Sequence, residues 1–441
     1  MSEDTGTSDV SATDEPRVYG SGSGPKKFKR AFLHIGSSKT GTSAIQSELF
    51  RNREYLRGLG YFYPNNDANH IFFASYFRED PTEIAFHGKN GRETKELIEV
   101  FHQTEMEKLK NDIDACSGHT LIISSEYLPP TSPAQCIEMS KFLHELCEQV
   151  TVVCYVRHPV LHAISAAQQT VKVGFKTLDR ARKTAFFFKP KKVLPKFINA
   201  FGRENIEVRT YDRDKLKGGD IVVDFLTLVG LKDEEIDKIG KPAANASLCY
   251  EVTLIADALT RQYPREINGL WNPKRAKFIN LMKIPGAKFG LSAETVKGVQ
   301  EKAAPDLDFL REEFGIDLGE VDNSRLSEPK PLWADETILG LADRINTFAL
   351  DAQHWKAEAV YLRSMNEERD GDMDRALHLA RLAVSLNSEG FSYLKQLCFL
   401  LKKLGRQKEA RTHVQRFMKL CPDDTRGSDL MKILEDESGS S

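Results

Sequence analysis

One segment of the chain combines residue types that bind phosphate. The sequence HIGSSKTGTS, residues 34–43, joins a β-type run to an amphipathic pattern marked by Ala44, Ile45 and Leu49. A strand that turns through a glycine-containing loop into a helix presents main-chain N–H groups and the positive end of the helix dipole to an anion. The segment therefore predicts a phosphate-binding loop at the end of a strand.

The position of the lysine distinguishes this loop from that of a nucleotide kinase. The kinase and NTPase pattern GxxxxGK[ST] puts lysine directly after its second glycine. Here the spacing from Gly36 to Gly41 is kept, but Lys39 stands two residues before Gly41. No clear apolar strand ends in an Asp that would hold Mg²⁺. A P-loop kinase or NTPase is thus disfavoured, although it stays open as an alternative.

A second anion site is predicted in YVRHPVLHAISAAQQ, residues 155–169. Arg157 ends a β-type run and offers a permanently charged, fork-shaped phosphate ligand. Pro159 suits the first position of a helix, so Ser165 falls about two turns inside that helix. The role of His158 between them stays open, and it can serve simply to shape the turn.

Together these motifs resemble those of sulfotransferases that use 3′-phosphoadenosine 5′-phosphosulfate (PAPS), particularly the bacterial carbohydrate-type members. HIGSSKTGTSAIQ is similar to their 5′-phosphosulfate loop, and the eight-residue spacing from Arg157 to Ser165 is similar to their 3′-phosphate site. The resemblance covers residues 28–250 with motifs and extends less securely to about residue 335. It implies that Lys39 contacts the bridging oxygen between phosphate and sulfate. The donor-binding residues that it implies are Ser38, Lys39, Thr40, Gly41, Thr42, Ser43, Arg157 and Ser165.

Sulfuryl transfer also needs a group that accepts the proton of the attacking hydroxyl. Glu126 follows the buried run HTLIISS, where desolvation would raise its pKa towards a useful range. The resemblance places a Glu or His base at a similar position. A capping or ion-pairing role beside Lys39 or Arg157 is the competing interpretation. His70, in YPNNDANH, is the alternative base, because a neutral imidazole accepts protons near pH 7.

The order of elements predicts an α/β fold. β-type runs at residues 28–36, 119–126, 150–157 and 205–212 are each followed by helical periodicity. Such alternation indicates a parallel sheet with helices on both faces, a P-loop-type three-layer arrangement whose ligands bind at the carboxyl ends of the strands. We assign residues 28–335 to this sulfotransferase domain.

The C-terminal part changes to continuous helical pattern. Residues 370–386 recur 34 residues later as 404–420, with Gly371 aligned to Gly405 and Ala376 to Ala410. This period resembles that of tetratricopeptide helical hairpins, and we assign residues 340–424 to such a module. Two repeats are too few for an independent array, so we expect them to pack on the catalytic domain. A plain helical extension that binds no partner stays open.

Composition limits the remaining possibilities. Lys and Arg number 62 against 64 Asp and Glu, so bulk charge gives no indication of nucleic acid. A basic stretch with three phenylalanines, residues 172–196, is either a solvated face or a field that attracts an anionic donor or glycan. The seven scattered cysteines lack CxxC spacing, so we expect reduced thiols and no metal. We expect disordered tails at residues 1–27 and 425–441, no signal peptide, no membrane span, and a cytoplasmic location.

The sequence thus predicts a PAPS-dependent sulfotransferase that needs no metal. We expect its acceptor to be a hydroxyl, or an amine, carried by a carbohydrate or glycoconjugate. The C-terminal repeats could bind a protein partner. A scaffold without catalytic activity, in which the α/β domain is a relic, is the alternative from another class, and the presence of Lys39, Arg157 and Ser165 argues against it.

Overall fold

The computed structural model describes residues 26–92, 94–239, 248–267, 270–276, 284, 286–321 and 333–435. Two predictions fall partly outside these ranges, the N-terminal tail up to residue 25 and the end of the C-terminal tail from residue 436.

The core of the fold is a five-stranded parallel sheet with strand order β2-β3-β1-β4-β5. Its strands are β1 (Phe28–His34), β2 (Tyr61–Phe62), β3 (Thr120–Ser124), β4 (Cys147–Val156) and β5 (Ile206–Thr210). The four predicted strands are confirmed, and β2 is an addition at one edge. Because β1 lies between β3 and β4, the segments that follow these three strands emerge side by side.

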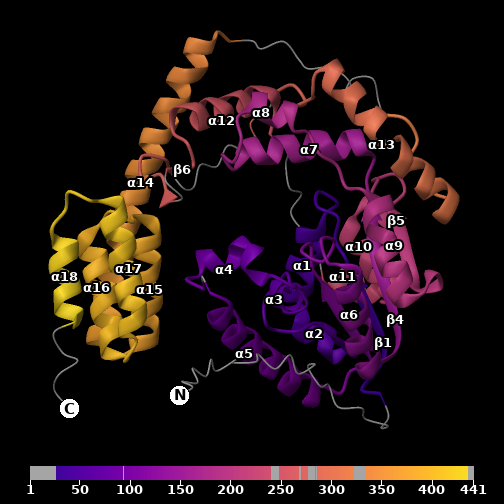
Figure 1. Cartoon of the computed structure of the whole chain (residues 1–441), viewed down its shortest axis with the longest axis horizontal. Coiled ribbons are helices and arrows are strands. Elements are labelled where there is room, and N and C mark those ends of the chain that lie inside the picture. The colour runs from indigo at the N-terminus through magenta and orange to yellow at the C-terminus, as the bar shows by residue number, and fades with distance from the viewer. Residues whose placement is uncertain are drawn as a thin grey trace, which may run out of the picture.

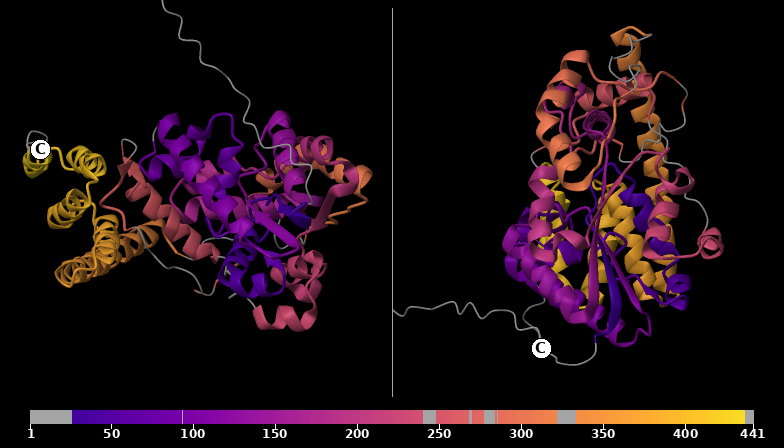
Figure 2. Two further views of the ribbon diagram at one scale, coloured as in Figure 1. Left: turned by 90° about the horizontal axis from the view of Figure 1, so that it is seen from below. Right: turned by 90° about the vertical axis from the view of Figure 1, so that its right-hand side faces the viewer.

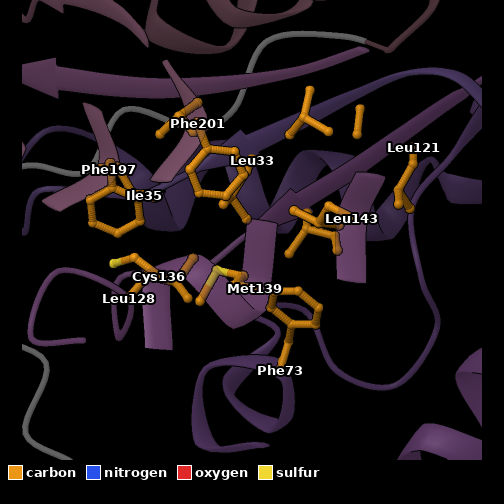
Figure 3. Close-up of a cluster of buried hydrophobic side chains, with 14 of the residues drawn as sticks. Leu33, Ile35, Phe73, Leu121, Leu128, Cys136, Met139, Leu143, Phe197 and Phe201 are labelled. Carbon is orange, nitrogen blue, oxygen red and sulfur yellow. The ribbon is translucent and has the colours of Figure 1, made fainter. Parts of the chain in front are cut away.

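Helices cover both faces of the sheet, as predicted (Figure 2). On one face, Leu33 and Ile35 pack with residues of α3 (Ile71–Tyr76), α5 (Lys95–Asp114), α6 (Pro133–Leu146) and α9 (Pro190–Phe201). Figure 3 shows this cluster, with Met139 of α6 and Phe197 of α9 beside the strand residues. On the other face, Phe32 packs with α1 (Thr42–Arg51), α2 (Arg53–Gly58), α10 (Ile221–Val229) and α11 (Asp233–Ile239). Alternating residues of β1 therefore fill two separate cores.

A helical layer lies beyond the carboxyl ends of the strands (Figure 1). It contains α7 (Pro159–Lys172), α8 (Leu178–Lys183), α12 (Tyr250–Gln262) and α13 (Ala293–Phe314). Val160 and Ile164 of α7 share a third core with Ala256 of α12 and Val299 of α13. This layer fixes α7 above the strand ends, where ligands of open parallel sheets bind.

The C-terminal region consists of antiparallel helices (Figure 1). They are α14 (Asp335–Arg369), α15 (Met373–Leu386), α16 (Phe391–Lys403), α17 (Gln407–Leu420) and α18 (Arg426–Glu435). The aligned glycines Gly371 and Gly405 both have positive φ, 89° and 73°, directly after a helix. The sequence repeat therefore corresponds to a repeated helix–glycine turn–helix unit.

This region packs on the α/β part through α14, as expected. Ile338 and Ala342 of α14 lie against Ile255 and Leu259 of α12. Arg261 adds an ion pair to Asp335, with Nη2 3.1 Å from Oδ1. Since α14 is continuous from Asp335, the predicted domain boundary at residues 335–340 lies inside its first two turns rather than in a linker.

The predicted C-terminal tail begins too early. We expected disorder from residue 425, but α18 covers Arg426–Glu435 and its Leu430 and Leu434 are buried against the other C-terminal helices. Two leucines four residues apart lie on one face of a helix, so they give α18 a stripe that packs against its neighbours.

α14 is 35 residues long, but Asp, Glu, Lys and Arg recur throughout it. Within the described ranges, no helix combines the length and the apolar content needed to cross a bilayer.

Candidate functional site

The predicted phosphate-binding segment forms a tight turn between β1 and α1, here called the glycine loop (residues 36–42). Gly41 is the N-cap of α1 with φ 77°, and Lys39 also has a positive φ of 67°. A Cβ on Gly41 would lie 2.8 Å from Ile221, and one on Gly36 would lie 2.6 Å from the Thr42 side chain. A side chain at either position would collide with its neighbour, so the tight turn favours glycine at both. A left-handed lysine costs about 1–2 kcal/mol, a strain that is common at functional sites.

The sheet brings Glu126 to this loop. The Gly36 N–H donates to the carbonyl of Ser125 at 3.2 Å, and the Ser125 N–H donates to the carbonyl of His34 at 3.0 Å. Pairing between β1 and β3 thus continues past the strand ends. Glu126, the next residue, starts a turn directly beside the glycine loop.

Arg157 reaches the same loop from β4. The Ile35 N–H donates to the carbonyl of Val153 at 2.9 Å, which fixes the register of β1 on β4. Nη1 of Arg157 donates to the main-chain carbonyl of Lys39 at 3.2 Å. The two anion sites predicted on separate strands are therefore joined by a direct hydrogen bond.

The electrostatics of the site follow from partial burial of opposite charges. Burial lowers the pKa of Lys39, and the nearby Glu126 opposes that shift while the cations Lys172 and Arg157 add to it. Burial raises the pKa of Glu126, and Lys39 opposes the shift. A carboxylate whose pKa is raised by burial accepts a proton more readily than an ordinary carboxylate does, so Glu126 is suited to act as a base.

The hydroxyl groups of the glycine loop are arranged differently from our expectation. Thr40 and Thr42 are buried and both donate to the carbonyl of Ser37, at 2.6 and 3.2 Å. Their side chains therefore hold the turn rather than face a ligand. What these residues offer an anion is their position at the N-terminus of α1, where the first N–H groups of a helix have no helical carbonyl. Ser43 is exposed on the first turn.

The helix α7 carries the remaining predicted residues. His158 is the N-cap of α7, and its Nδ1 accepts a hydrogen bond from the Val160 N–H at 3.2 Å. The sequence left the role of His158 open, and in the structure it caps this helix. Pro159 is the first helical residue, as predicted. Ser165 is partly buried two turns further on.

His162 is a site residue that the sequence did not single out. It is buried on α7, with Nε2 3.4 Å from Oγ of Ser38 in the glycine loop. Burial lowers its pKa to about 4, so it is neutral at pH 7. Ser165 lies three residues after His162, and residues at that spacing share a helix face. The sequence signal that could have revealed His162 is this shared helix face, on which Lys172 also lies near the end of α7.

Tyr211 was also missed. Its ring lies under the Arg157 guanidinium, 5.5 Å from ring centroid to Cζ, and a Cβ on Gly41 would come within 3.2 Å of it. The Tyr211 N–H donates to the carbonyl of Val156 at 2.7 Å, which places it directly after β5. Tyr211 thus supports both Arg157 and the start of α1.

The alternative base His70 is not available for proton transfer. It is fully buried with φ 42°, its Nδ1 accepts from the Ser124 N–H at 3.1 Å, and Nε2 donates to the Pro64 carbonyl at 3.2 Å. Burial lowers its pKa to about 4. Because both ring nitrogens are bonded to the main chain, His70 connects the segment before α3 to the end of β3, and the hypothesis that it is a base is contradicted by this geometry.

The site as a whole is suited to an anion with a neighbouring hydroxyl. Lys39, Arg157 and Lys172 supply positive charge, α1 supplies a helix N-terminus, and Glu126 supplies one carboxylate. Among the residues that the structure describes, no three His, Cys, Asp or Glu side chains gather in a way that could hold a metal ion.

Comparisons with known proteins leave the family of the chain unassigned. No protein-family model and no solved structure matches it. An uncharacterized protein of Archaeoglobus fulgidus is 30% identical over 162 residues, which are 37% of this chain and 43% of that protein. The chain therefore matches less than half the length of this relative, which is itself uncharacterized.

Proposed function

We propose that this chain is a PAPS-dependent sulfotransferase. The observation that supports it best is the hydrogen bond from Arg157 to the carbonyl of Lys39, 3.2 Å long. A donor with a 5′-phosphosulfate and a 3′-phosphate needs two anion sites at a fixed separation. A direct bond between the residues assigned to the two sites is how a protein would hold that separation constant.

The side chains divide the work of an in-line displacement. Lys39 neutralises charge on the oxygen that leaves sulfur, while the N-terminus of α1 and Arg157 bind the two phosphates. Glu126 takes the proton from the acceptor hydroxyl. At the same time the acceptor oxygen bonds to sulfur, and the bond from sulfur to the bridging oxygen breaks. Ser165 joins Arg157 at the 3′-phosphate. His162 holds Ser38 and so positions the loop.

Two features support a carbohydrate or glycoconjugate as acceptor. The ring of Phe186 is half-exposed and meets His162 edge-on, with centroids 5.8 Å apart. This gives the site an aromatic face on the side of α7. Lys172, at the end of the same helix, is exposed. Aromatic faces with nearby cations suit sugars that carry acidic groups. The C-terminal helices, as tetratricopeptide-like hairpins, would bind a protein partner.

The test is transfer of labelled sulfate from PAPS to a panel of sugars, phenols and amines. We expect transfer by the wild type, and a loss of at least 100-fold in Lys39→Ala, because the leaving oxygen loses its cation. Arg213→Ala is the matched control, since Arg213 is exposed two residues after Tyr211. Equal transfer by Lys39→Ala and the wild type would show that the proposal is wrong.

A further inference from the structure

The longest helix carries a row of exposed apolar side chains. Leu341, Phe348, Trp355 and Leu362 of α14 are exposed by 39%, 71%, 71% and 51%. They follow one another at intervals of seven residues. Large aromatic side chains exposed in a continuous row mark an interaction surface rather than ordinary surface variation.

A second row completes a heptad pattern. Ile345, Ala352 and Ala359 each stand four residues after one member of the first row and three before the next. Alternate spacing of four and three is the a/d pattern of a coiled coil, with Leu341 as the first d position. Its period of 3.5 residues indicates a partner helix that runs alongside, because a stripe buried in a globular core follows 3.6.

Most of this row is distinct from the face that α14 uses inside the chain; the exception is Ile345, which is partly buried and packs against the α12 cluster. Ala342 is buried against α12, and Ala357 and Val360 are buried with Leu379 and Ala383 of α15. At 100° per residue, Ala357 lies on the opposite side of the helix from Phe348, and Ala342 and Val360 lie about 120° away from Phe348. Packing against α12 and α15 therefore leaves every member of the heptad row except Ile345 exposed. In Figure 1, α14 runs from the upper edge of the molecule into the C-terminal helices.

We propose that the heptad row binds the same row of a second copy, in a parallel two-stranded coiled coil of α14. Three heptads from Leu341 to Leu362 extend about 32 Å at 1.5 Å per residue. The partner must offer a straight helix of that length with the same period. The α14 of a second copy meets both conditions, and two-fold symmetric pairing of identical surfaces is the commonest form of oligomer.

The flanking charges favour the parallel orientation. In a parallel pair, each g position faces the e position five residues later in the other helix. Here Asp351 at g would face Lys356 of the second copy, and Glu358 would face Arg363. Asp351, Lys356 and Arg363 are exposed, whereas Glu358 is partly buried and accepts a hydrogen bond from the Tyr393 hydroxyl at 2.8 Å, so the Asp351–Lys356 pair carries the charge argument. An antiparallel pair would bring e against e, and the basic residues Lys356 and Arg363 would then repel each other.

The first experiment measures the mass of the full chain by sedimentation equilibrium. We expect a dimer for the wild type and a monomer for Phe348→Glu/Trp355→Glu, which places charge in the apolar row. Thr347→Glu/His354→Glu is the control, since it makes the same change one residue earlier at exposed positions outside the row. A monomeric wild type up to its solubility limit, or a dimer that survives Phe348→Glu/Trp355→Glu, would overturn the proposal. Circular dichroism confirms that each variant is folded.

The second experiment tests orientation and partner. Lys356→Glu should weaken the dimer at least fivefold by facing Asp351, and adding Asp351→Lys should restore it. Trp355→Cys should form an interchain disulfide on mild oxidation, because equivalent d positions meet in a parallel pair, whereas His354→Cys should not. If Lys356→Glu is neutral and Trp355→Cys stays uncrosslinked, the row binds a helix other than its own copy and the proposal fails.

Discussion

Nη1 of Arg157 lies 3.2 Å from the main-chain carbonyl oxygen of Lys39 and donates a hydrogen bond to it. The bond joins the end of β4 to the loop that follows β1. It also holds Lys39 in a left-handed conformation, φ 67°. The same guanidinium therefore positions the lysine and stays close enough to bind an anion beside it.

Replacing Arg157 should weaken binding of 3′-phosphoadenosine 5′-phosphate by about 10- to 100-fold, since a charge-assisted phosphate contact contributes about 1.5–3 kcal/mol. Arg157→Lys should fail nearly as badly, because an ammonium cannot reproduce the planar fork. Titration with the bisphosphate and with 5′-AMP separates the two sites. If the variant loses affinity equally for both ligands, Arg157 supports only the glycine loop.

Replacing Lys39 by glycine should raise the stability of the fold relative to Lys39→Ala, although it abolishes activity. Glycine adopts the positive φ without strain, so the free energy of unfolding of Lys39→Gly, measured in urea, should be about 1 kcal/mol higher than that of Lys39→Ala. Both variants should lose transfer activity. A stability equal to that of Lys39→Ala would mean that the left-handed conformation costs nothing.

Glu126→Gln should keep donor affinity and lose turnover, because the amide cannot accept the proton of the acceptor. The raised pKa of Glu126 predicts that wild-type turnover falls as pH drops through that pKa, when the base becomes protonated. Glu145→Gln, an exposed change on α6, is the control. Normal turnover by Glu126→Gln would remove Glu126 from the catalytic step.

The same variant should be more stable than the wild type at neutral pH. A folded-state pKa above the unfolded value means that the buried charge opposes folding at high pH. The gain in melting temperature should therefore shrink as pH falls from the raised folded-state pKa to the ordinary carboxyl pKa, and it should be absent below the ordinary value. A variant that melts lower than the wild type at pH 7 would show that Glu126 stabilises the fold through its electrostatic attraction to Lys39.

His70→Gln should destabilise the fold by about 2–4 kcal/mol, since it leaves the buried Ser124 N–H and Pro64 carbonyl without partners. His354→Gln, an exposed change on α14, should stay within about 0.5 kcal/mol. Turnover per folded molecule should be unchanged in both. A large loss of turnover at full stability would return His70 to the list of bases.

Buried histidines should also make the fold sensitive to acid. The pKa of His70 is lowered to about 4 and that of His34 to about 3, so the unfolded chain takes up these protons first. Stability should therefore be fully present above pH 6.5 and fall towards pH 4, by up to about 1.4 kcal/mol per pH unit for each histidine. Urea unfolding at several pH values measures the slope, and a flat profile would contradict it.

The sequence predicted the parts of the fold that rest on local pattern. The long apolar runs that became β1, β3, β4 and β5 were found because each shows several β-type residues before a polar end. The edge strand β2, Tyr61–Phe62, was missed because two residues cannot show a period. The tail prediction failed at α18 because Leu430 and Leu434 are buried only by tertiary packing.

The site was predictable up to the point where side chains meet across elements. Lys39, Glu126 and Arg157 each follow a predicted strand, so their convergence followed from parallel topology. His162 and Tyr211 contribute through contacts with residues more than 100 positions away, which no local spacing encodes. For His70 the sequence suggested a catalytic role that the structure does not support. Only the structure reveals that main-chain groups bind both of its ring nitrogens.

The most direct test of the proposed function is calorimetric titration of the wild type with 3′-phosphoadenosine 5′-phosphate and, separately, with ATP and Mg²⁺. We predict binding of one bisphosphate per chain, loss of at least tenfold in affinity in Arg157→Ala, and no heat of binding with ATP and Mg²⁺. Binding of ATP and Mg²⁺ without binding of the bisphosphate would contradict the account and favour a kinase or NTPase.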